Sequence, residues 1–321
     1  MPAPLTAAAA FNRIEVVAAV IFNERGEFLL AQRPTGKVYA GYWEFPGGKI
    51  EAGETAACAL ARELHEELGI EVITAYPWLT RDFDYSHAAV RLRFFRVLKW
   101  SGELRAREQQ QFLWQSVRAI TVAPLLPANG PILRALELPP SYGITCAAEL
   151  GREIFMPRLE RALANGLKLI QLREKQLTGA TRRELASEIV ALAHRAGARV
   201  MINGAPDLVA QVNADGVHLT ASQLMAATHR PDCAWCGASC HDATELARAR
   251  ALGIDFVVLG PVSATPSHAG AKLLGWRQFA RLIRDFPLPV YALGGMRAEH
   301  MEQAWSCGAH GVAMVRGAWG L

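Results

Sequence analysis

Residues 48–70 read GKIEAGETAACALARELHEELGI, and this stretch decides the fold of the first part of the chain. Its apolar residues recur at helical intervals, at Ala57, Leu60, Ala61, Leu64 and Leu68. This spacing predicts an amphipathic helix over residues 55–68 that packs one apolar stripe inward. Gly48 and Gly53 allow a tight loop before the helix, and Gly69 suits its C-terminal cap.

Three carboxylates, those of Glu63, Glu66 and Glu67, gather on another face of the predicted helix. Like charges at this spacing repel one another, so they stay ionised together when a cation lies between them. Oxygen ligands select the hard cations Mg²⁺ and Mn²⁺. A solvated acidic face with weak Glu–Arg pairs is the alternative interpretation.

The whole stretch fills the pattern G-x5-E-x7-R-E-U-x-E-E-x-G-U, in which U is aliphatic. This pattern resembles the signature of the Nudix hydrolases. Over residues 14–138 the chain is similar to the MutT-type Nudix enzymes, which hydrolyse 8-oxo-dGTP to the monophosphate and pyrophosphate. The likeness rests on AQR (31–33), WEFPGGKIE (43–51), KWSGE (99–103) followed by Glu108, and PAN (127–129). It implies an α/β/α sandwich with a mixed sheet.

The resemblance also implies catalytic and metal-binding residues. Mg²⁺ or Mn²⁺ would be held by the Gly47 carbonyl, Glu66, Glu67 and Glu108. Glu63, with Glu108 as its rival, would help to activate the attacking water. Glu54 and Arg62 would pair to brace the loop. In this chemistry a carboxylate takes the proton of a water that attacks phosphorus in line.

The substrate-binding residues follow from the same likeness. Arg33 would contact the phosphates, and the nucleotide pocket would be lined by Glu44, Phe45, Pro46 and Gly47. Asn129 would read the purine edge, because an amide can pair with both O6 and the N7 hydrogen of oxidised guanine. Without the resemblance, Asn129 in PANGP is typical of a turn. The departures from the MutT pattern are Val38, Tyr85 and Ser86.

The implied function is sanitation of the nucleotide pool, which avoids mutation during DNA replication and belongs with DNA repair. Hydrolysis of another nucleoside diphosphate derivative is the alternative. The net charge of +4 is modest and no Lys/Arg run is concentrated, so small phosphorylated substrates are favoured over nucleic acid. The start, MPAPLTAAAAF, has no basic region and charges interrupt the later apolar stretches, so we expect no membrane partner and a cytoplasmic protein.

The length of 321 residues and the hydrophobic content of 51% predict two domains with real cores. Leu138-Pro139-Pro140-Ser141 blocks helix continuation. We therefore place a first domain at residues 1–138, a linker at 139–141 and a second domain at 142–321.

Apolar runs typical of strands alternate with helical stretches in the second domain. The runs are ITCAA (144–148), LKLIQLR (167–173), RVMIN (199–203), DGVHLT (215–220), AWCGASC (234–240), DFVVLG (255–260), PVYALGG (289–295) and HGVAMV (310–315). Eight such runs with crossover helices predict a parallel (β/α)8 TIM barrel, so the whole chain is of the α/β class.

This domain is similar to thiamine phosphate synthase and its thiazole tautomerase relatives. The matching segments are QLREK (171–175), MIN (201–203), ADGVHL (214–219), GAS (237–239), GPVSAT (260–265) and ALGGM (292–296). They end strands, where barrel active sites form. The resemblance implies that an aminopyrimidine diphosphate is held by Gln171, Arg173, Lys175 and Asn203. Phosphates of this ligand or of the thiazole would be held by Ser239, Thr265, Ser267 and Gly294.

Three positions depart from the synthase pattern. Gly204 stands where the motif Asn-Asp has its acid, and Gln223 stands where ADGVHLGQED has its last acid, so both Mg²⁺ carboxylates are absent. Without the cation, the diphosphate leaving group is not neutralised. His268 replaces the Lys of the T-x-T-K loop, so a fixed charge becomes titratable. We expect a pocket for a phosphorylated thiamine precursor without synthase activity; a ligand-sensing module and an active synthase are the alternatives.

This domain also contains a cysteine-rich segment and a histidine in one of its predicted strands. Cys233, Cys236, Cys240 and His241 form C-x2-C-x3-C-H. Zinc binding is one interpretation, but a buried strand leaving the barrel is favoured because there is one C-x2-C pair, and six cysteines fit reduced thiols. His218 is expected to be a buried barrel histidine rather than a catalyst.

Overall fold

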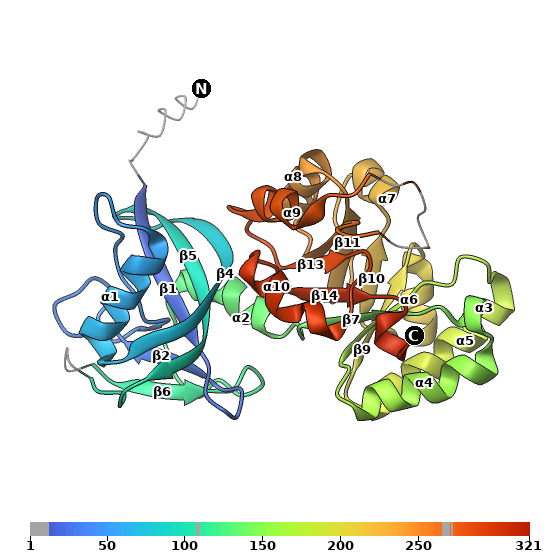
Figure 1. Cartoon of the computed structure of the whole chain (residues 1–321), viewed down its shortest axis with the longest axis horizontal. Helices are drawn as coiled ribbons and strands as arrows, with labels where there is room; N and C mark the ends of the chain where they lie inside the picture. The colour runs from blue at the N-terminus through green and yellow to red at the C-terminus, as the bar shows by residue number, and fades with distance from the viewer. Residues whose placement is uncertain (1–12, 107–109, 265–269, 271) are drawn as a thin grey trace, which may run out of the picture. The chain divides into compact units, whose positions relative to one another are not determined.

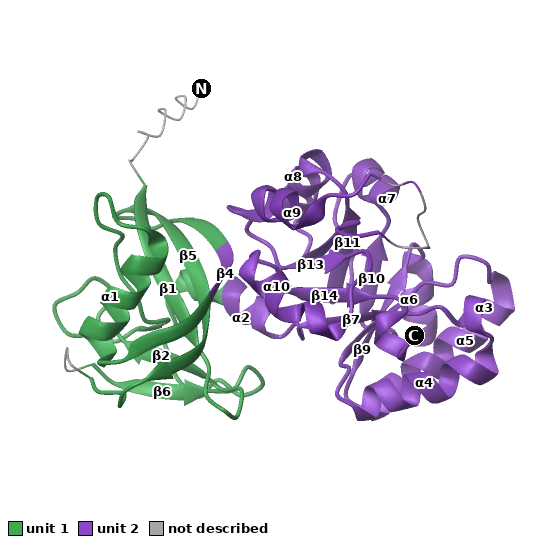
Figure 2. Ribbon diagram, in the orientation of Figure 1, with its two compact units in different colours: residues 1–75, 80–130 green, residues 76–79, 131–321 purple. Residues whose placement is uncertain are grey.

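The computed structural model describes residues 13–106, 110–264, 270 and 272–321. The chain divides into two compact units, Met1–Ala75 with Thr80–Gly130, and Tyr76–Leu79 with Pro131–Leu321 (Figure 2). This division assigns residues 131–138 to the second unit, whereas the sequence placed the boundary at residues 139–141.

The described part of the first unit contains two three-stranded sheets (Figure 1). One sheet has the order β1-β5-β4, formed by β1 (Ile14–Ile21), β5 (Ala89–Ser101) and β4 (Glu71–Asp84). The other has the order β3-β2-β6, formed by β3 (Trp43–Glu44), β2 (Phe28–Gln32) and β6 (Phe112–Gln115). β1 is parallel to β5, whereas β2 is antiparallel to both of its neighbours. The predicted mixed arrangement is therefore confirmed.

Helix α1 (Ala56–Leu68) supplies the acidic residues, and its ends follow from local chemistry. Thr55 Oγ1 accepts a hydrogen bond from the Cys58 N–H at 3.2 Å, so the helix begins one residue later than predicted. Gly69 ends it in a left-handed conformation with φ of 71°. The buried residues are Ala59, Leu60, Leu64 and Leu68. The prediction that Ala57 packs inward was wrong, because Ala57 is exposed and Ala59 takes that place.

The second unit contains a closed barrel with the strand order β10-β11-β12-β13-β14-β7-β8-β9 (Figure 1). The strands are β7 (Ser141–Ile144), β8 (Leu169–Leu172), β9 (Arg199–Asn203), β10 (Gly216–Leu219), β11 (Trp235–Cys240), β12 (Phe256–Leu259), β13 (Val290–Leu293) and β14 (Gly311–Met314). Each described pairing is parallel, and β14 pairs with β7 to close the barrel, as predicted. The first strand was misplaced at residues 144–148, since Ala147–Leu150 form helix α3.

The helices from residue 130 onward alternate with the barrel strands in chain order, and α2 comes before β7. They are α2 (Gly130–Leu136), α3 (Ala147–Leu150), α4 (Arg152–Ala164), α5 (Gly179–Arg195), α6 (Pro206–Val212), α7 (Ala221–Ala226), α8 (Ala243–Leu252), α9 (Gly275–Ile283) and α10 (Met301–Ser306). The barrel interior is filled by aromatic rings, with Tyr142 5.5 Å from both Phe256 and Tyr291 between ring centroids. This packed layer leaves the C-terminal ends of the strands as the place for a ligand.

Candidate functional sites

Glu63 projects from α1 into space left by the missing side chain of Gly48. A Cβ placed on Gly48 would lie 2.2 Å from a Glu63 carboxylate oxygen, well inside contact distance. Gly48 is therefore needed so that this carboxylate can approach the backbone. The sequence predicts only loop flexibility for Gly48, because a contact between residues fifteen positions apart has no local signal.

Arg62 ties the loop before α1 to the helix itself. Its guanidinium donates to the two Glu54 oxygens at 3.1 and 3.0 Å, and to the Lys49 carbonyl at 3.0 Å. It also donates to Glu63 Oε1 at 2.9 Å and to Glu66 Oε2 at 3.2 Å. The hydrogen bonds that Arg62 donates to Glu54 and Glu63 raise the pKa of Arg62, and the bond to Glu54 lowers the pKa of that carboxyl. Arg62 is therefore a cation shared by three carboxylates.

Glu67 lies against the backbone of Gly47. The Gly47 N–H donates to Glu67 Oε2 at 3.3 Å. Gly47 has a φ of 149°, and a Cβ there would lie 2.1 Å from the Val17 carbonyl oxygen in β1. Glycine is therefore required between β1 and α1, at the point where the resemblance implies a metal-binding carbonyl.

The acidic residues of α1 have the right chemistry for a hard dication. Glu66, Glu67 and the Gly47 carbonyl offer only oxygen, the donor preferred by Mg²⁺ and Mn²⁺. Among the described residues, no three His, Cys, Asp or Glu side chains form a group that could hold an ion. Glu108, which the resemblance adds to the set, lies outside the described residues.

Arg33 and Glu44, both implied as substrate-binding residues, form an ion pair. Arg33 Nη1 lies 2.6 Å from both Glu44 oxygens, and Arg33 Nε donates to the Val38 carbonyl at 2.7 Å. Burial raises the pKa of Glu44, although the charge of Arg33 opposes that shift. The pair brings together Glu44, which is expected to line the nucleotide pocket, and Arg33, which is expected to contact the phosphates.

Asn129 is buried, with 4% of its surface exposed. Its Nδ2 donates to the Trp43 carbonyl at 3.2 Å, and no described residue donates a hydrogen bond to its Oδ1. Phe45 points elsewhere, since its ring packs in the core at 5.7 Å from Phe28 and 5.8 Å from Phe94 between centroids. The Pro46 carbonyl accepts from the Ala19 N–H at 2.7 Å, which anchors this segment to β1.

An aromatic group beside Glu44 was missed by the sequence analysis. The ring of Tyr85 lies 5.5 Å from both Tyr39 and His87, and Tyr39 lies 5.1 Å from Tyr42, between centroids. Burial, followed by the charge of Glu44, raises the pKa of Tyr85 to about 12. The sequence showed Tyr85 as a departure from the family pattern, but only the fold brings it next to Tyr39.

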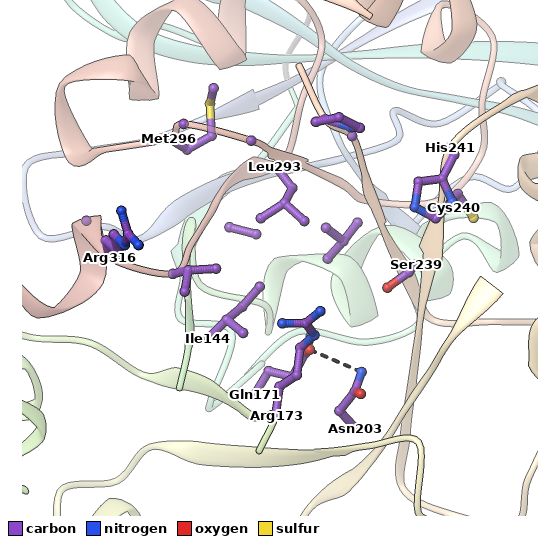
Figure 3. A pocket seen from close by; sticks show the side chains of 18 of the residues that line it. Ile144, Gln171, Arg173, Asn203, Ser239, Cys240, His241, Leu293, Met296 and Arg316 are labelled. Atoms are coloured by element: carbon purple, nitrogen blue, oxygen red, sulfur yellow. Dashed lines mark hydrogen bonds between the residues drawn. The ribbon is translucent and has the colours of Figure 1, made fainter. Parts of the chain in front are cut away.

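A cavity of about 690 Å³ opens at the C-terminal ends of the barrel strands (Figure 3). Its cationic lining residues are Arg173, Lys175, Arg297 and Arg316, with His241. No Asp or Glu occurs among its lining residues in the described part of the chain. Burial lowers the pKa of Arg173, and its guanidinium donates no hydrogen bond to a residue in the described part of the chain. The cavity is therefore suited to an anion.

A chain of hydrogen bonds runs from this cavity into the barrel. Asn203 Nδ2 donates to Gln171 Oε1 at 3.2 Å (Figure 3). Gln171 Nε2 in turn donates to the Tyr142 hydroxyl at 3.1 Å. His218 lies 3.3 Å from that hydroxyl through Nδ1 and 3.1 Å from Ser239 Oγ through Nε2. Burial, followed by the charge of Arg173, lowers the pKa of His218 to about 3. His218 is therefore a neutral, buried barrel residue.

The remaining implied barrel ligands are distributed as follows. Gly294, with φ of 109°, lines the cavity at the end of β13, where a Cβ would lie 2.8 Å from Pro261. Thr265, Ser267 and His268 lie outside the described residues.

The C-x2-C-x3-C-H segment does not gather around one ion. Cys233 precedes β11, whereas Cys240 ends the strand and His241 follows it. A strand advances about 3.3 Å per residue, so the two ends of β11 lie on opposite faces of the barrel. His241 Nδ1 pairs instead with Glu245 Oε2 at 2.9 Å. The described residues therefore support the strand interpretation.

Among the described residues, every helix is too short or too polar to cross a membrane.

Comparison with known proteins gives one family for each unit. The family model described as NUDIX domain matches residues 12–136, and the model described as Thiamine monophosphate synthase matches residues 141–318. An 8-oxo-dGTP diphosphatase of Haemophilus influenzae is 39% identical over 123 residues, which cover 38% of this chain and 90% of that protein. A CTP pyrophosphohydrolase of Escherichia coli is 43% identical over 122 residues, which cover 38% of this chain and 90% of that protein. A thiamine-phosphate synthase of Synechocystis sp. is 36% identical over 169 residues, which cover 51% of this chain and 49% of that protein.

Proposed function

We propose a function for each half of a chain that belongs to two families, the NUDIX domain family over residues 12–136 and the thiamine monophosphate synthase family over residues 141–318. The first domain is a Nudix hydrolase. Its proposed reaction is the hydrolysis of 8-oxo-dGTP to 8-oxo-dGMP and pyrophosphate. The second domain is proposed to bind a phosphorylated thiamine precursor without making thiamine phosphate.

The proposed preference for 8-oxo-dGTP rests on the buried side-chain amide of Asn129. Its Oδ1 accepts no hydrogen bond from a described residue, and Nδ2 uses one hydrogen on Trp43, so an acceptor and a second donor hydrogen remain. Oxidised guanine offers an N7 hydrogen to this acceptor, whereas ordinary guanine offers another acceptor. The 39% identical Haemophilus influenzae relative is named for this activity.

The residues of α1 divide the catalytic work. A divalent cation held by Glu66, Glu67, the Gly47 carbonyl and Glu108 would neutralise the triphosphate and polarise the phosphorus. Glu63 is kept beside Gly48 and accepts the Arg62 hydrogen bond at 2.9 Å, which orients its carboxylate. This carboxylate is the group proposed to accept the proton of the attacking water. Arg33 would add charge at the phosphates from its place beside Glu44.

A pyrimidine triphosphate is the second candidate substrate, because the 43% identical Escherichia coli relative is a CTP pyrophosphohydrolase. A nucleoside diphosphate derivative such as ADP-ribose is the third. Turnover of 8-oxo-dGTP, dGTP, CTP and ADP-ribose should be compared side by side with Mg²⁺, with Mn²⁺ and with EDTA. The proposal requires the highest kcat/KM for 8-oxo-dGTP and no turnover in EDTA; a higher kcat/KM for CTP would overturn the purine assignment.

The barrel proposal rests on Gly204 and Gln223, which stand at the positions of the two synthase carboxylates. The cavity keeps its cationic lining while lacking those acids, which supports phosphate binding without metal-assisted diphosphate loss. The name of the Synechocystis relative favours the alternative, an active synthase. The full chain should fail to restore growth of a synthase-deficient strain on thiamine-free medium, yet show a thermal shift with phosphorylated thiazole that Arg173→Ala abolishes. Restored growth would establish the alternative.

A further inference from the structure

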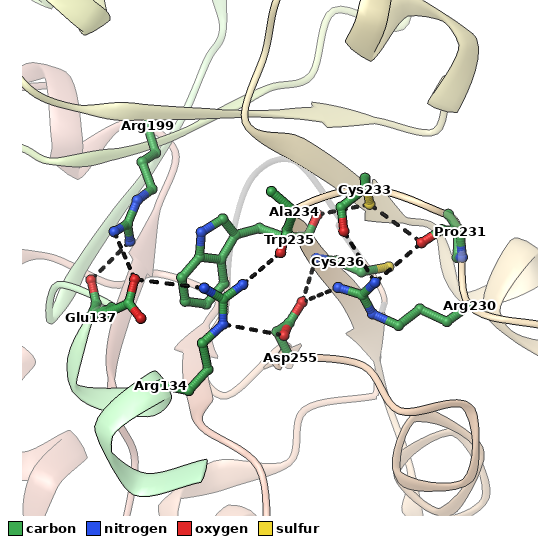
Figure 4. Close-up of polar contacts among 10 residues, drawn as sticks. All are labelled: Arg134, Glu137, Arg199, Arg230, Pro231, Cys233, Ala234, Trp235, Cys236 and Asp255. Carbon is green, nitrogen blue, oxygen red and sulfur yellow. Dashed lines mark hydrogen bonds and ion pairs between the residues drawn. The ribbon is translucent and has the colours of Figure 1, made fainter. Parts of the chain in front are cut away.

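Two thiols meet at the N-terminal end of β11, on the face of the barrel opposite the ligand cavity. Residues 232–234 bend before the strand, and the bend brings the Cys233 thiol into interaction range of the Cys236 thiol. Both cysteines lie beside Arg230 (Figure 4). Cys233 Sγ also donates to the Trp235 carbonyl at 3.1 Å. Neither thiol takes part in the chemistry proposed above.

The two thiols differ in how accessible they are to reagents in solution. Cys233 is half-buried and lines a separate cavity of about 620 Å³ together with His194, Asp215 and Asp232. Cys236 is buried inside the barrel wall, and it does not line that cavity. A reagent in this cavity can therefore reach Cys233 but not Cys236.

The Arg230 guanidinium lies beside this pair of cysteines. Arg230 donates to the Cys233 carbonyl at 3.1 Å and to Asp255 Oδ2 at 2.6 Å, and Asp255 Oδ2 also accepts from the Cys236 N–H at 2.7 Å (Figure 4). The hydrogen bond from Cys236, helped by the Arg230 charge, lowers the pKa of Cys233 to about 6 against the effects of burial and Asp255. The hydrogen bond to Cys233 and burial raise the pKa of Cys236. This asymmetry separates an attacking thiol from a resolving thiol.

We propose that Cys233 and Cys236 are a redox-active dithiol that a low-molecular-weight disulfide oxidises to an intramolecular disulfide. The Cys233 thiolate attacks one sulfur of the small disulfide, forming a mixed disulfide and expelling one thiolate. Cys236 gives up its proton and attacks the Cys233 sulfur, which forms the Cys233–Cys236 bond and expels the second thiolate. The protein loses two protons and two electrons, and the small disulfide becomes two thiols.

The test uses the full chain equilibrated in glutathione buffers of increasing oxidised fraction, then alkylated and mapped by mass spectrometry. All six cysteines are free in the structure, and we expect the oxidised protein to retain four thiols with the new bond mapped to Cys233 and Cys236. Cys58→Ala, which removes an exposed thiol, should still form the bond. Cys236→Ala should stop at a glutathione adduct on Cys233, and Cys233→Ala should leave Cys236 unmodified.

Six remaining thiols across the whole range, a bond mapped to another pair, or a stable glutathione adduct on wild-type Cys233 would overturn the proposal. Because the buried Cys236→Ala change can disturb folding, a second measurement uses the wild-type protein alone. Iodoacetamide at pH 7 should alkylate Cys233 about tenfold faster than the more exposed Cys58, owing to its larger thiolate fraction. Equal rates, or a faster Cys58, would contradict the thiolate assignment.

Discussion

Gln223 Nε2 donates a hydrogen bond to the Gly204 carbonyl at 3.0 Å, and these two residues occupy the positions at which the synthase motif carries its acids. A Cβ on Gly204 would lie 3.5 Å from Gln223 Oε1, so the two positions adjoin in space. Gln223 Oε1 also accepts from the Thr220 N–H at 3.1 Å, which caps helix α7. The Gln223 amide, which caps helix α7, and Gly204 therefore occupy the two positions at which a pair of carboxylates would bind a cation.

Restoring both acids should create a cation site in the barrel. The Gly204→Asp/Gln223→Asp variant should bind Mg²⁺ by calorimetry in a Glu67→Gln background, which weakens binding at the Nudix site. Gly204 has φ of 66°, which Asp tolerates at a cost of about 1 kcal/mol. The matched control Gly204→Asn/Gln223→Asn has the same shape without charge and should bind none. Equal binding by the two variants would show that these positions do not face a common cation.

Changing Glu63→Gln or Glu67→Gln should lower kcat of the hydrolase by about 100-fold or more, because each removes a charge assigned to proton transfer or metal binding. The melting temperature should change little, since neither carboxylate belongs to the apolar core. Glu51→Gln is the control, as Glu51 is exposed in the same loop and should retain wild-type kcat. Wild-type rates in Glu63→Gln would remove this residue from the mechanism.

Asn129→Ala should reduce the preference for 8-oxo-dGTP over dGTP more than it reduces turnover of dGTP. One buried donor–acceptor contact is worth about 1 to 3 kcal/mol, so the ratio of kcat/KM values should fall roughly 10- to 100-fold. Asn129→Asp keeps the acceptor, so it should retain part of the preference. An unchanged ratio in Asn129→Ala would place base recognition elsewhere, with Tyr85 as the nearest candidate.

Acid should destabilise the barrel through His218. Its pKa of about 3 in the folded chain lies below the value of about 6.5 expected when unfolded. Between these values the unfolded state binds more protons, so stability is complete above about pH 6.5 and falls as the pH drops, by about 1.4 kcal/mol per unit. From pH 7 to pH 5, urea unfolding of the wild type should therefore lose about 2 kcal/mol more than that of His218→Gln. Parallel losses in both proteins would contradict a neutral, buried His218.

Periodicity and turn chemistry were sufficient to predict much of the fold. The α1 stripe, its Gly69 cap and the alternation of apolar runs with helices all depend on neighbours within a few residues. These signals predicted the closed barrel, whereas the mixed sheet was implied by the resemblance to the Nudix hydrolases. They misplaced the first barrel strand, because ITCAA is apolar but its second half forms helix α3.

Long-range contacts explain what the sequence did not predict at the sites. Tyr142 and His218 are 76 residues apart, yet they share the hydrogen-bond chain that reaches Asn203. Gly48 and Glu63, or Tyr39 and Tyr85, likewise meet only through the fold. No local pattern encodes such pairs, so the motif supplied candidate residues while the structure supplied their partners.

The segment before the Pro-Pro link has a practical consequence for dissecting the protein. The Arg134 guanidinium lies 3.2 Å from the ring centroid of Trp235, and Arg199 donates to the Glu137 carbonyl at 2.9 Å. Leu138 belongs to the same apolar cluster as Tyr142 and Trp235. A recombinant fragment that begins at residue 142 would lack Arg134, Glu137 and Leu138, so it would expose Trp235 at the N-terminal end of the barrel to water. A fragment that begins near residue 130 would keep these residues and therefore keep Trp235 covered.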